Sequence, residues 1–315
     1  MRYLPGKSYL AARGFLHHLL GEIPRPSRVD GELVSLWDAP EPGPVYWTRN
    51  VWLEPFILEF GSISEAAKAL RAMQRNWAPC PARLHRRMAL ISEALPPIPA
   101  KPKAFPFALP GSPMGAFTLL DEHTLLASAR CSNPFPNGEF QFVEDKEGPP
   151  SRAYRKIWEA LLYAGRLPGP GDLCLDAGAS PGGWTWALAG LGAEVIAVDR
   201  APLADSVAAM KGVRFLRGDA FSLKPGDIGP VDWLCSDVIC YPKALYRWIE
   251  SWLESGLAKR FICTIKMQGK DWDRETTSLF ASLQGSMVVH LWHNRHELTW
   301  ISAGTEPSSC PATPP

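Results

Sequence analysis

The stretch Asp176-Ala177-Gly178-Ala179-Ser180-Pro181-Gly182-Gly183-Trp184 lies near the middle of this 315-residue chain. The apolar run Leu173-Cys174-Leu175 precedes it, and a segment with helical character, 185–191, follows it. This order predicts a buried strand, a glycine-rich turn and the start of a helix. Glycines let the backbone approach a ligand, and the amides at a helix start can receive a carboxylate. We therefore expect residues 176–184 to cradle a nucleotide-like cofactor.

Three aspartates at the ends of successive predicted strands narrow the choice of cofactor. The loop departs from the GxGxxG pattern of dinucleotide-binding proteins because Ser180 takes the place of the second glycine, which disfavours NAD. Asp199 ends the second strand and can accept both hydroxyls of a ribose, and Asp219 follows the third strand, where an acid suits the exocyclic amine of adenine. Each aspartate alone could be a helix N-cap or a loop acid. Together with Asp176 they predict S-adenosylmethionine (SAM).

Strands and helices alternate from about residue 150 onward. A helix is expected over 151–165, and strands are expected over 172–176, 194–199, 213–217, 231–236, 260–266, 286–292 and 296–302. Repeated strand–helix units with short links predict a parallel sheet covered by helices on both faces, and the closing hairpin predicts one antiparallel strand. The fold class is therefore α/β, a Rossmann-like seven-stranded SAM-dependent methyltransferase domain preceded by a small α+β domain.

The domain organisation follows from composition. Residues 1–110 read as the small α+β domain, with a helix over 9–20, short strands within 45–60 and a helix over 62–77. Prolines cluster between Pro96 and Pro113, which excludes a regular helix or a central strand there. We expect a connector over 111–150, the methyltransferase domain over 151–303 and a flexible tail over 304–315.

One segment of the first domain is strongly basic. Residues 71–103 hold Arg71, Arg75, Arg83, Arg86, Arg87, Lys101 and Lys103 against one acid, Glu93. Two interpretations stay open: a solvated helix face, or a patch that binds the backbone of RNA.

Whole-chain composition sets limits on partner and compartment. The formal net charge is +1, so no global field attracts nucleic acid, and an RNA-binding surface must be local. The seven cysteines show no metal-ligand spacing, and no metal site is expected. Neither a signal peptide nor an apolar run of transmembrane length is present. We expect a reduced, cytoplasmic protein without a membrane partner.

The loop at 176–184 and several later motifs resemble the FtsJ-like RNA ribose 2'-O-methyltransferases. The resemblance spans about 125–302, with Ala177 where the family usually has Leu. The segment Cys131-Ser132-Asn133-Pro134-Phe135-Pro136-Asn137-Gly138 is similar to the RlmM subgroup, which acts on large-subunit ribosomal RNA. That subgroup carries a THUMP-type RNA-binding module ahead of the catalytic domain, so residues 1–110 are compatible with a THUMP-like role.

The resemblance also implies a catalytic Lys-Asp-Lys-Glu tetrad. Its first lysine matches Lys156 in Ser151-Arg152-Ala153-Tyr154-Arg155-Lys156, and its aspartate matches Asp237 in Cys235-Ser236-Asp237. Its second lysine matches Lys266 in Cys263-Thr264-Ile265-Lys266, and its glutamate matches Glu297 in Arg295-His296-Glu297-Leu298. Ser151 joins the residues of the glycine-rich loop and the three strand-end acids in the expected cofactor site, with Asp237 shared between cofactor and catalysis.

Elementary chemistry agrees with this set. The sulfonium of SAM is a strong electrophile and a ribose hydroxyl a weak nucleophile, so the enzyme must align the two and remove one proton. Lys266 can accept that proton only when it is uncharged. The hypothesis is that Lys266 is the base, that Lys156 and Glu297 position the ribose and the lysine, and that Asp237 bridges the methyl donor and Lys266.

Two alternatives remain open at this stage. Asp237 is followed by Val238-Ile239-Cys240 rather than the family's usual Met-Ala-Pro. RNA cytosine-5 methyltransferases use cysteine nucleophiles three residues after an Asp at the end of the fourth strand and at the end of the fifth strand. Cys240 has that spacing and Cys263 lies in the fifth predicted strand, so such an enzyme is one rival. The other is a SAM-binding RNA-binding protein without catalysis. Under the main hypothesis the partner is RNA, with large-subunit ribosomal RNA implied by the resemblance, no DNA partner is expected, and the protein is expected to be a monomer.

Overall fold

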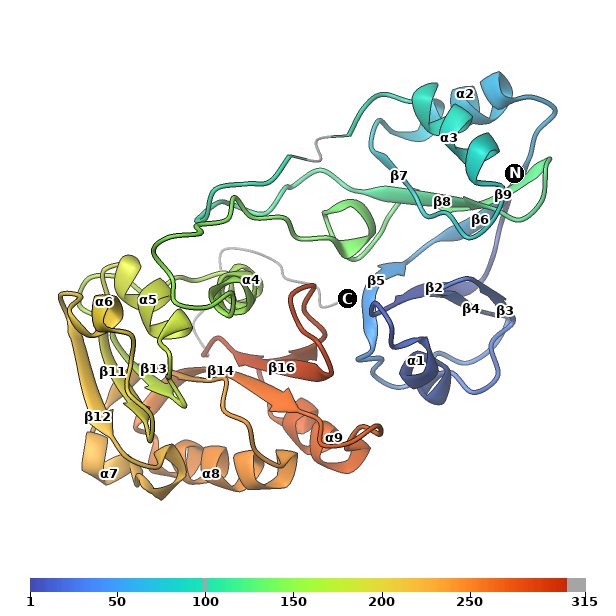
Figure 1. Cartoon of the computed structure of the whole chain (residues 1–315). Helices are drawn as coiled ribbons and strands as arrows, with labels where there is room; N and C mark the ends of the chain where they lie inside the picture. Colours follow the sequence, from blue (N-terminus) through green and yellow to red (C-terminus); the bar gives the residue numbers. More distant parts are fainter. Residues whose placement is uncertain (99–100, 305–315) are drawn as a thin grey trace. The chain divides into compact units, whose positions relative to one another are not determined.

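The computed structural model describes residues 1–98 and 101–304, and it divides into two compact units (Figure 1). The first unit comprises Met1–Lys103 and Ala108–Gln141, and the second comprises Ala104–Phe107 and the described residues from Phe142 onward. Among the described helices, none combines the length and the apolar character needed to cross a bilayer.

The first unit is built on two sheets. The larger has the order β1-β6-β9-β8-β7, and the smaller has the order β3-β4-β2-β5. The strands of the larger sheet are β1 (Arg2–Tyr3), β6 (Pro55–Glu59), β7 (Trp77–Pro79), β8 (Gly115–Leu119) and β9 (Thr124–Ser128). Those of the smaller sheet are β2 (Gly6–Ala11), β3 (Arg28–Asp30), β4 (Leu33–Trp37) and β5 (Thr48–Trp52). The helices are α1 (Leu16–Glu22), α2 (Ile63–Met73) and α3 (His85–Glu93), with a 3-10 turn at Pro136–Gly138.

The helix expected over 62–77 is present as α2, which begins after its N-cap Ser62. The Ser62 hydroxyl accepts a hydrogen bond from the backbone N–H of Glu65 at 3.2 Å, as an N-cap serine should. Ala66, Ala67 and Leu70 of this helix are buried in a core that α3 and the larger sheet share.

The helix expected over 9–20 was a wrong prediction. Residues up to Ala11 form β2, which pairs with β4 on one side and β5 on the other, and the helix begins only at Leu16. Tyr9, Leu10 and Ala11 are all buried. A strand at the centre of a covered sheet carries a continuous apolar run, and such a run cannot be told from a short buried helix by periodicity.

The predicted boundary between the domains was also wrong. The expected connector, 111–150, contains β8 and β9, which pair with each other and with β7 and β6. These two strands complete the sheet of the first unit, so that unit extends to Gln141. In its described part the proline-rich stretch between Glu93 and Gly115 contains no helix or strand, as predicted. Of the expected tail, 305–315 lie outside the described residues.

The second unit has the predicted seven-stranded sheet, in the order β12-β11-β10-β13-β14-β16-β15. All neighbours up to β14 are parallel, and β16 is antiparallel to both β14 and β15. The strands are β10 (Leu173–Ala177), β11 (Glu194–Asp199), β12 (Val213–Arg217), β13 (Val231–Ser236), β14 (Ala258–Lys266), β15 (Ser286–Val289) and β16 (Glu297–Ser302). The α/β class and the single antiparallel strand are therefore confirmed.

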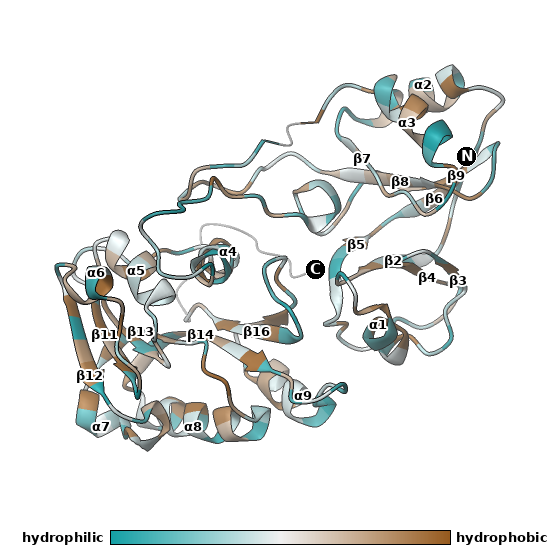
Figure 2. Cartoon of the chain, viewed as in Figure 1, coloured by the Kyte–Doolittle hydropathy of each residue, from teal (hydrophilic) through white to brown (hydrophobic). Residues whose placement is uncertain are grey.

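Helices connect these strands. They are α4 (Tyr154–Ala164), α5 (Gly183–Gly190), α6 (Asp205–Ala208), α7 (Pro225–Ile228), α8 (Pro242–Ser255) and α9 (Arg274–Ser282). Helices α8 and α9 carry both hydrophobic and hydrophilic residues (Figure 2), because one face of each packs on the sheet. The last predicted strand pair is shorter than expected: β15 ends at Val289, and residues 290–296 form a loop.

The packing of α9 gives a stability prediction. Phe280 is fully buried and lies against Trp300 of β16, with ring centroids 5.3 Å apart, whereas its neighbour Leu279 is exposed. Phe280→Ala should lower the free energy of unfolding by about 3–5 kcal/mol, and Leu279→Ala by less than about 0.5 kcal/mol. Urea unfolding of both variants measures the contrast, and equal losses would contradict the packing.

Candidate active site

A cavity of about 410 Å³ opens where β10, β11, β13 and β14 end. Because these strands are parallel, their carboxyl ends meet at one edge of the sheet. The cavity is lined by most of the residues expected to hold the cofactor: Ser151, Asp176, Gly178, Ala179, Ser180, Pro181, Gly183, Trp184, Asp199 and Asp237. Lys266 lines it as well.

A second cavity, of about 200 Å³, adjoins the first and shares Gly178, Asp199, Val238 and Ile239 with it. Asp219 lines this second cavity together with Ala220 and Phe221. The three strand-end acids are thus spread over two adjoining cavities.

Two glycines of the loop are required by close packing. Gly178 has φ +82°, and a Cβ atom there would stand 2.6 Å from Cβ of Val238. A Cβ atom on Gly183 would stand 2.4 Å from Oγ of Ser151. Gly182, also expected in the site, has φ +114° and faces Val207 as the N-cap of α5, so its role in the structure is to turn the chain.

Asp176 is the buried acid of the loop. Its carboxylate accepts a hydrogen bond from Oγ1 of Thr185 at 2.6 Å, and only 1% of the residue is exposed. Burial raises the pKa of Asp176 to about 7, and the negative charges of Asp237 and Asp199 add to the rise against the hydrogen bond from Thr185. An acid held in this way favours a positively charged ligand beside it.

Asp199 and Asp219 already have protein partners. Asp199 accepts hydrogen bonds from the backbone N–H groups of Ser180 at 2.9 Å and Ala201 at 2.8 Å. Asp219 pairs with Arg200 and accepts from the N–H of Phe221, and these contacts lower the pKa of its carboxyl. A carboxylate has about four acceptor positions, so both acids retain capacity for a ligand.

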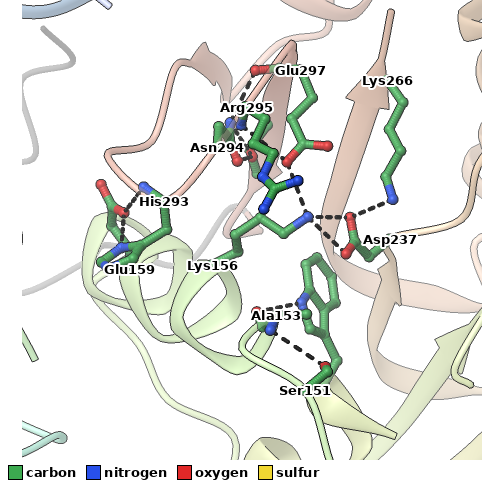
Figure 3. Close-up of polar contacts among 12 residues, drawn as sticks. Ser151, Ala153, Lys156, Glu159, Asp237, Lys266, His293, Asn294, Arg295 and Glu297 are labelled. Atoms are coloured by element: carbon green, nitrogen blue, oxygen red, sulfur yellow. Dashed lines mark hydrogen bonds and ion pairs between the residues drawn. The ribbon is translucent and has the colours of Figure 1, made fainter. Parts of the chain in front are cut away.

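The four residues of the expected tetrad lie together (Figure 3). Nζ of Lys156 donates to both carboxylate oxygens of Asp237 at 2.7 Å and to Oε1 of Glu297 at 3.0 Å. Nζ of Lys266 lies 3.2 Å from Oδ1 of Asp237. Lys266 and Glu297 are paired directly across β14 and β16, which explains why residues 31 positions apart share this place.

The two lysines differ in electrostatic environment. Burial alone would lower the pKa of Lys156, but the charges of Asp237 and Glu297 outweigh it, and the pKa of Lys156 is raised. Lys156 therefore stays a cation with two carboxylate partners. Lys266 contacts one oxygen of one carboxylate and faces the cavity.

Helix α4 brings Lys156 to Asp237 at the edge of the cavity, and two contacts hold that helix end in place. The indole Nε1 of Trp184 donates to the carbonyl of Ala153 at 3.0 Å, which ties the start of α5 to the start of α4. The backbone N–H of Ala153 lies 3.4 Å from Oγ of Ser151. The glycine-rich loop and the start of the helix that carries Lys156 are thus linked through Trp184, Ala153 and Ser151.

Glu159, which was not expected in the site, lies one turn after Lys156 on α4. Only 1% of Glu159 is exposed, and its carboxylate accepts from the backbone N–H groups of Trp292 at 2.8 Å and His293 at 3.1 Å. It also contacts Nδ1 of His293 at 2.8 Å. These bonds fix the loop that leads to Glu297. An acid on the buried side of a strongly apolar helix was the available signal.

Val238 and Ile239 line both cavities but were not expected among the site residues. Apolar residues in a loop produce no periodic pattern in the sequence that would indicate a site.

Comparison with known proteins gives the family. Residues 149–268 match the model of the FtsJ-like methyltransferases. Ribosomal RNA large subunit methyltransferase M of Alkalilimnicola ehrlichii is 34% identical over 189 residues, which cover 56% of this chain and 52% of that protein. The protein of the same name from Xanthomonas oryzae pv. oryzae is 31% identical over 254 residues, which cover 76% of this chain and 69% of that protein.

This chain belongs to the ribosomal RNA large subunit methyltransferase M family. The resemblance to FtsJ-like enzymes and to this subgroup is thereby confirmed. The chain spans about half the length of several of the curated family members it matches.

Asp176 gives the second prediction. Its carboxyl is protonated in the folded protein below about pH 7, whereas in the unfolded chain it ionises near its ordinary pKa of about 4. Between these values the folded state holds the extra proton, so the stability of the ligand-free protein falls as the pH rises from about 4 to about 7. Asp176→Asn removes this contribution. The free energy of unfolding of the variant, relative to that of the wild type, should therefore rise by up to about 4 kcal/mol as the pH increases over that range.

Urea unfolding of both proteins at several pH values from 4 to 8 measures this difference. A difference in the free energy of unfolding that does not change with pH would contradict the burial of an ionisable Asp176.

Proposed function

We propose that this protein transfers a methyl group from SAM to the 2'-hydroxyl of a ribose in RNA, with large-subunit ribosomal RNA as the substrate. The single observation that carries the proposal is the carboxylate of Asp237, placed between Lys156 and Lys266 at the edge of the 410 Å³ cavity. The names of the relatives, which describe methyltransferases of large-subunit ribosomal RNA, support the choice of substrate.

The two adjoining cavities suit the methyl donor. The larger would take the methionine part beside Asp176 and the loop 178–184, with Asp199 on the ribose hydroxyls, and the smaller would take adenine beside Asp219. Asp176 inside the larger cavity favours a cationic ligand, which agrees with the ammonium and sulfonium groups of SAM. When bound, SAM supplies a methyl group on a positively charged sulfur.

Lys266 is the proposed base. Its amine takes the proton of the 2'-hydroxyl while that oxygen bonds to the methyl carbon and the carbon–sulfur bond breaks, which leaves methylated ribose, S-adenosylhomocysteine and a protonated Lys266. General-base assistance of this kind contributes about 10²–10⁴-fold to a rate. Lys156 does not compete for the role because its raised pKa keeps it protonated.

Lys156, Asp237 and Glu297 are proposed to position the reacting groups. Lys156 holds the two acids together through three hydrogen bonds. Asp237 also contacts Lys266, so it fixes the base with respect to the cavity. Glu297 lies across the strand pair from Lys266 and can accept a hydrogen bond from the acceptor ribose.

The first unit is proposed to bind RNA as a THUMP-like module. Arg71, Arg75, Arg86 and Lys101 of its basic segment are exposed. Arg83 instead pairs with the buried Asp30 at 2.5 Å, and the guanidinium of Arg87 lies over the ring of Phe60. Arg83 and Arg87 are therefore engaged in contacts within the first unit, whereas the four exposed residues support contact with phosphates.

The rival reaction, methylation of cytosine C5 by Cys240 and Cys263, is not favoured. Burial raises the pKa of the Cys240 thiol to about 11 and that of the Cys263 thiol well above its ordinary value. Both thiols are thus protonated at neutral pH and poor nucleophiles. Cys263 is also fully buried within the sheet.

The test of Lys266 uses two substitutions. Lys266→Met removes the amine, and Lys266→Arg keeps a positive charge that cannot give up its proton. Both should lower the rate of labelled methyl transfer to ribosomal RNA from a strain that lacks the enzyme by about 10²–10⁴-fold. Calorimetric titration should show that both variants still bind SAM.

Cys240→Ser and Cys263→Ser serve as the matched contrast, since both should transfer methyl groups at the wild-type rate. A fully active Lys266→Arg protein would show that a charge and not a base is needed. Inactive serine variants that still bind SAM would favour the cytosine-5 reaction.

A further inference from the structure

Two neighbouring apolar side chains beside the candidate active site are unusually exposed. Ile239 is 78% exposed and Tyr241 is 71% exposed, more than any other large hydrophobic residue in the described part of the chain. Single exposed apolar residues are common on protein surfaces, but two on one short loop beside a cavity make that loop a candidate binding surface.

The pattern of exposure indicates that both side chains face solvent from the same side of the loop. Tyr241 has extended backbone angles, φ −69° and ψ 137°. Exposure alternates along the segment: Val238, Cys240 and Pro242 are partly or fully buried, whereas Ile239 and Tyr241 are exposed. An extended chain directs alternate side chains to opposite sides, so Ile239 and Tyr241 face solvent together.

The inward side chains anchor this loop. Val238 packs on Gly178, where an added Cβ atom would stand 2.6 Å from it. The carbonyl of Cys240 accepts a hydrogen bond from Nε2 of Gln268 at 3.2 Å, and the buried Pro242 begins α8. The exposed pair is therefore presented by a fixed segment and does not depend on a mobile tip.

The loop begins at the centre of the proposed chemistry. Asp237 is its first residue and contacts both Lys156 and Lys266, and Ile239 lines both cavities. A ribose whose 2'-hydroxyl reaches Lys266 must therefore bring its own base, or the base of a neighbouring nucleotide, close to this segment.

We propose that Tyr241, flanked by Ile239, stacks an unpaired nucleobase of the acceptor RNA. This inference rests on the proposed function and adds to it the kind of acceptor: a nucleotide whose base is out of a duplex. Sequence-tolerant stacking on exposed aromatic rings is the usual way in which proteins hold single-stranded RNA.

Charge favours RNA over a protein partner. Lys243 follows Tyr241 by two residues in the first turn of α8, is exposed, and forms no ion pair with any residue of 1–98 or 101–304. The first turn of α8 also lacks acidic residues. A stable protein interface buries about 800 Å² on each partner around an apolar centre, more than two side chains beside a lysine provide.

The test compares two oligomers in the full-length protein loaded with S-adenosylhomocysteine. One is a fluorescein-labelled single-stranded RNA of mixed sequence, and the other is a ribose-phosphate oligomer of equal length without bases. Fluorescence anisotropy should show that the wild type prefers the RNA by about tenfold or more, because each stacked base contributes to affinity.

Tyr241→Ala and Tyr241→Gln should lose this preference, whereas Tyr241→Phe should keep it. Leu279→Ala, which removes an exposed apolar side chain on α9, is the matched control and should behave as the wild type. All variants should bind S-adenosylhomocysteine as the wild type does, which establishes that they are folded. A wild type without preference for bases, or a Tyr241→Ala protein with the full preference, would overturn the proposal.

Methyl transfer separates this inference from the function on which it rests. A wild type that transfers no methyl group to RNA but loses its base preference on Tyr241→Ala would overturn the proposed reaction and support stacking. A wild type that methylates ribosomal RNA with the same KM for RNA as Tyr241→Ala would support the reaction and overturn stacking.

Discussion

The carboxylate of Asp237 is the contact on which the arrangement of the site depends. It accepts two hydrogen bonds from Lys156 and lies beside Lys266, while Lys156 also reaches Glu297. Four ionisable groups at this low exposure are costly unless each has a partner, and removal of one leaves the others uncompensated. The strands and the helix that carry these four residues must therefore bring them to one place.

Three separate elements of the fold make this delivery possible. Parallel strands place Asp237 and Lys266 at the same sheet edge, and the antiparallel pairing of β14 with β16 sets Glu297 opposite Lys266. Lys156 comes from α4, whose position is fixed by Trp184 at one end and by Glu159 one turn further on. The same sheet edge lines the cavities, so the methyl donor and Lys266 would be held by neighbouring strands.

The sequence was sufficient to predict those parts of the molecule that rest on local pattern. The strand–turn–helix at 176–184 has its own signature of apolar run, glycines and helix start, and the seven strands follow from short apolar runs with helical segments between them. The tetrad could be named because the short motifs that contain its members resemble those of the FtsJ-like family. The contacts among its members could not be predicted, since they join side chains of residues 29 to 141 positions apart in the sequence.

Other features had no local signature. Strand β2 reads as a helix because it is buried on both faces, and β8 and β9 lie beyond a proline-rich stretch that resembles a domain boundary. Their assignment to the first sheet depends on pairing with strands far away in sequence. Glu159 and the exposed Tyr241 likewise acquire meaning only from their neighbours in space.

The proposed reaction of this site is methylation of the 2'-oxygen of a ribose in large-subunit ribosomal RNA. The most direct measurement maps methylated nucleotides in total RNA from otherwise identical cells with and without the gene, with ribose and base methylation read separately. We expect the deletion to remove a ribose 2'-O-methyl group from large-subunit ribosomal RNA and to leave 5-methylcytosine unchanged. Loss of a base methyl group, or an unchanged pattern of ribose methylation, would contradict it.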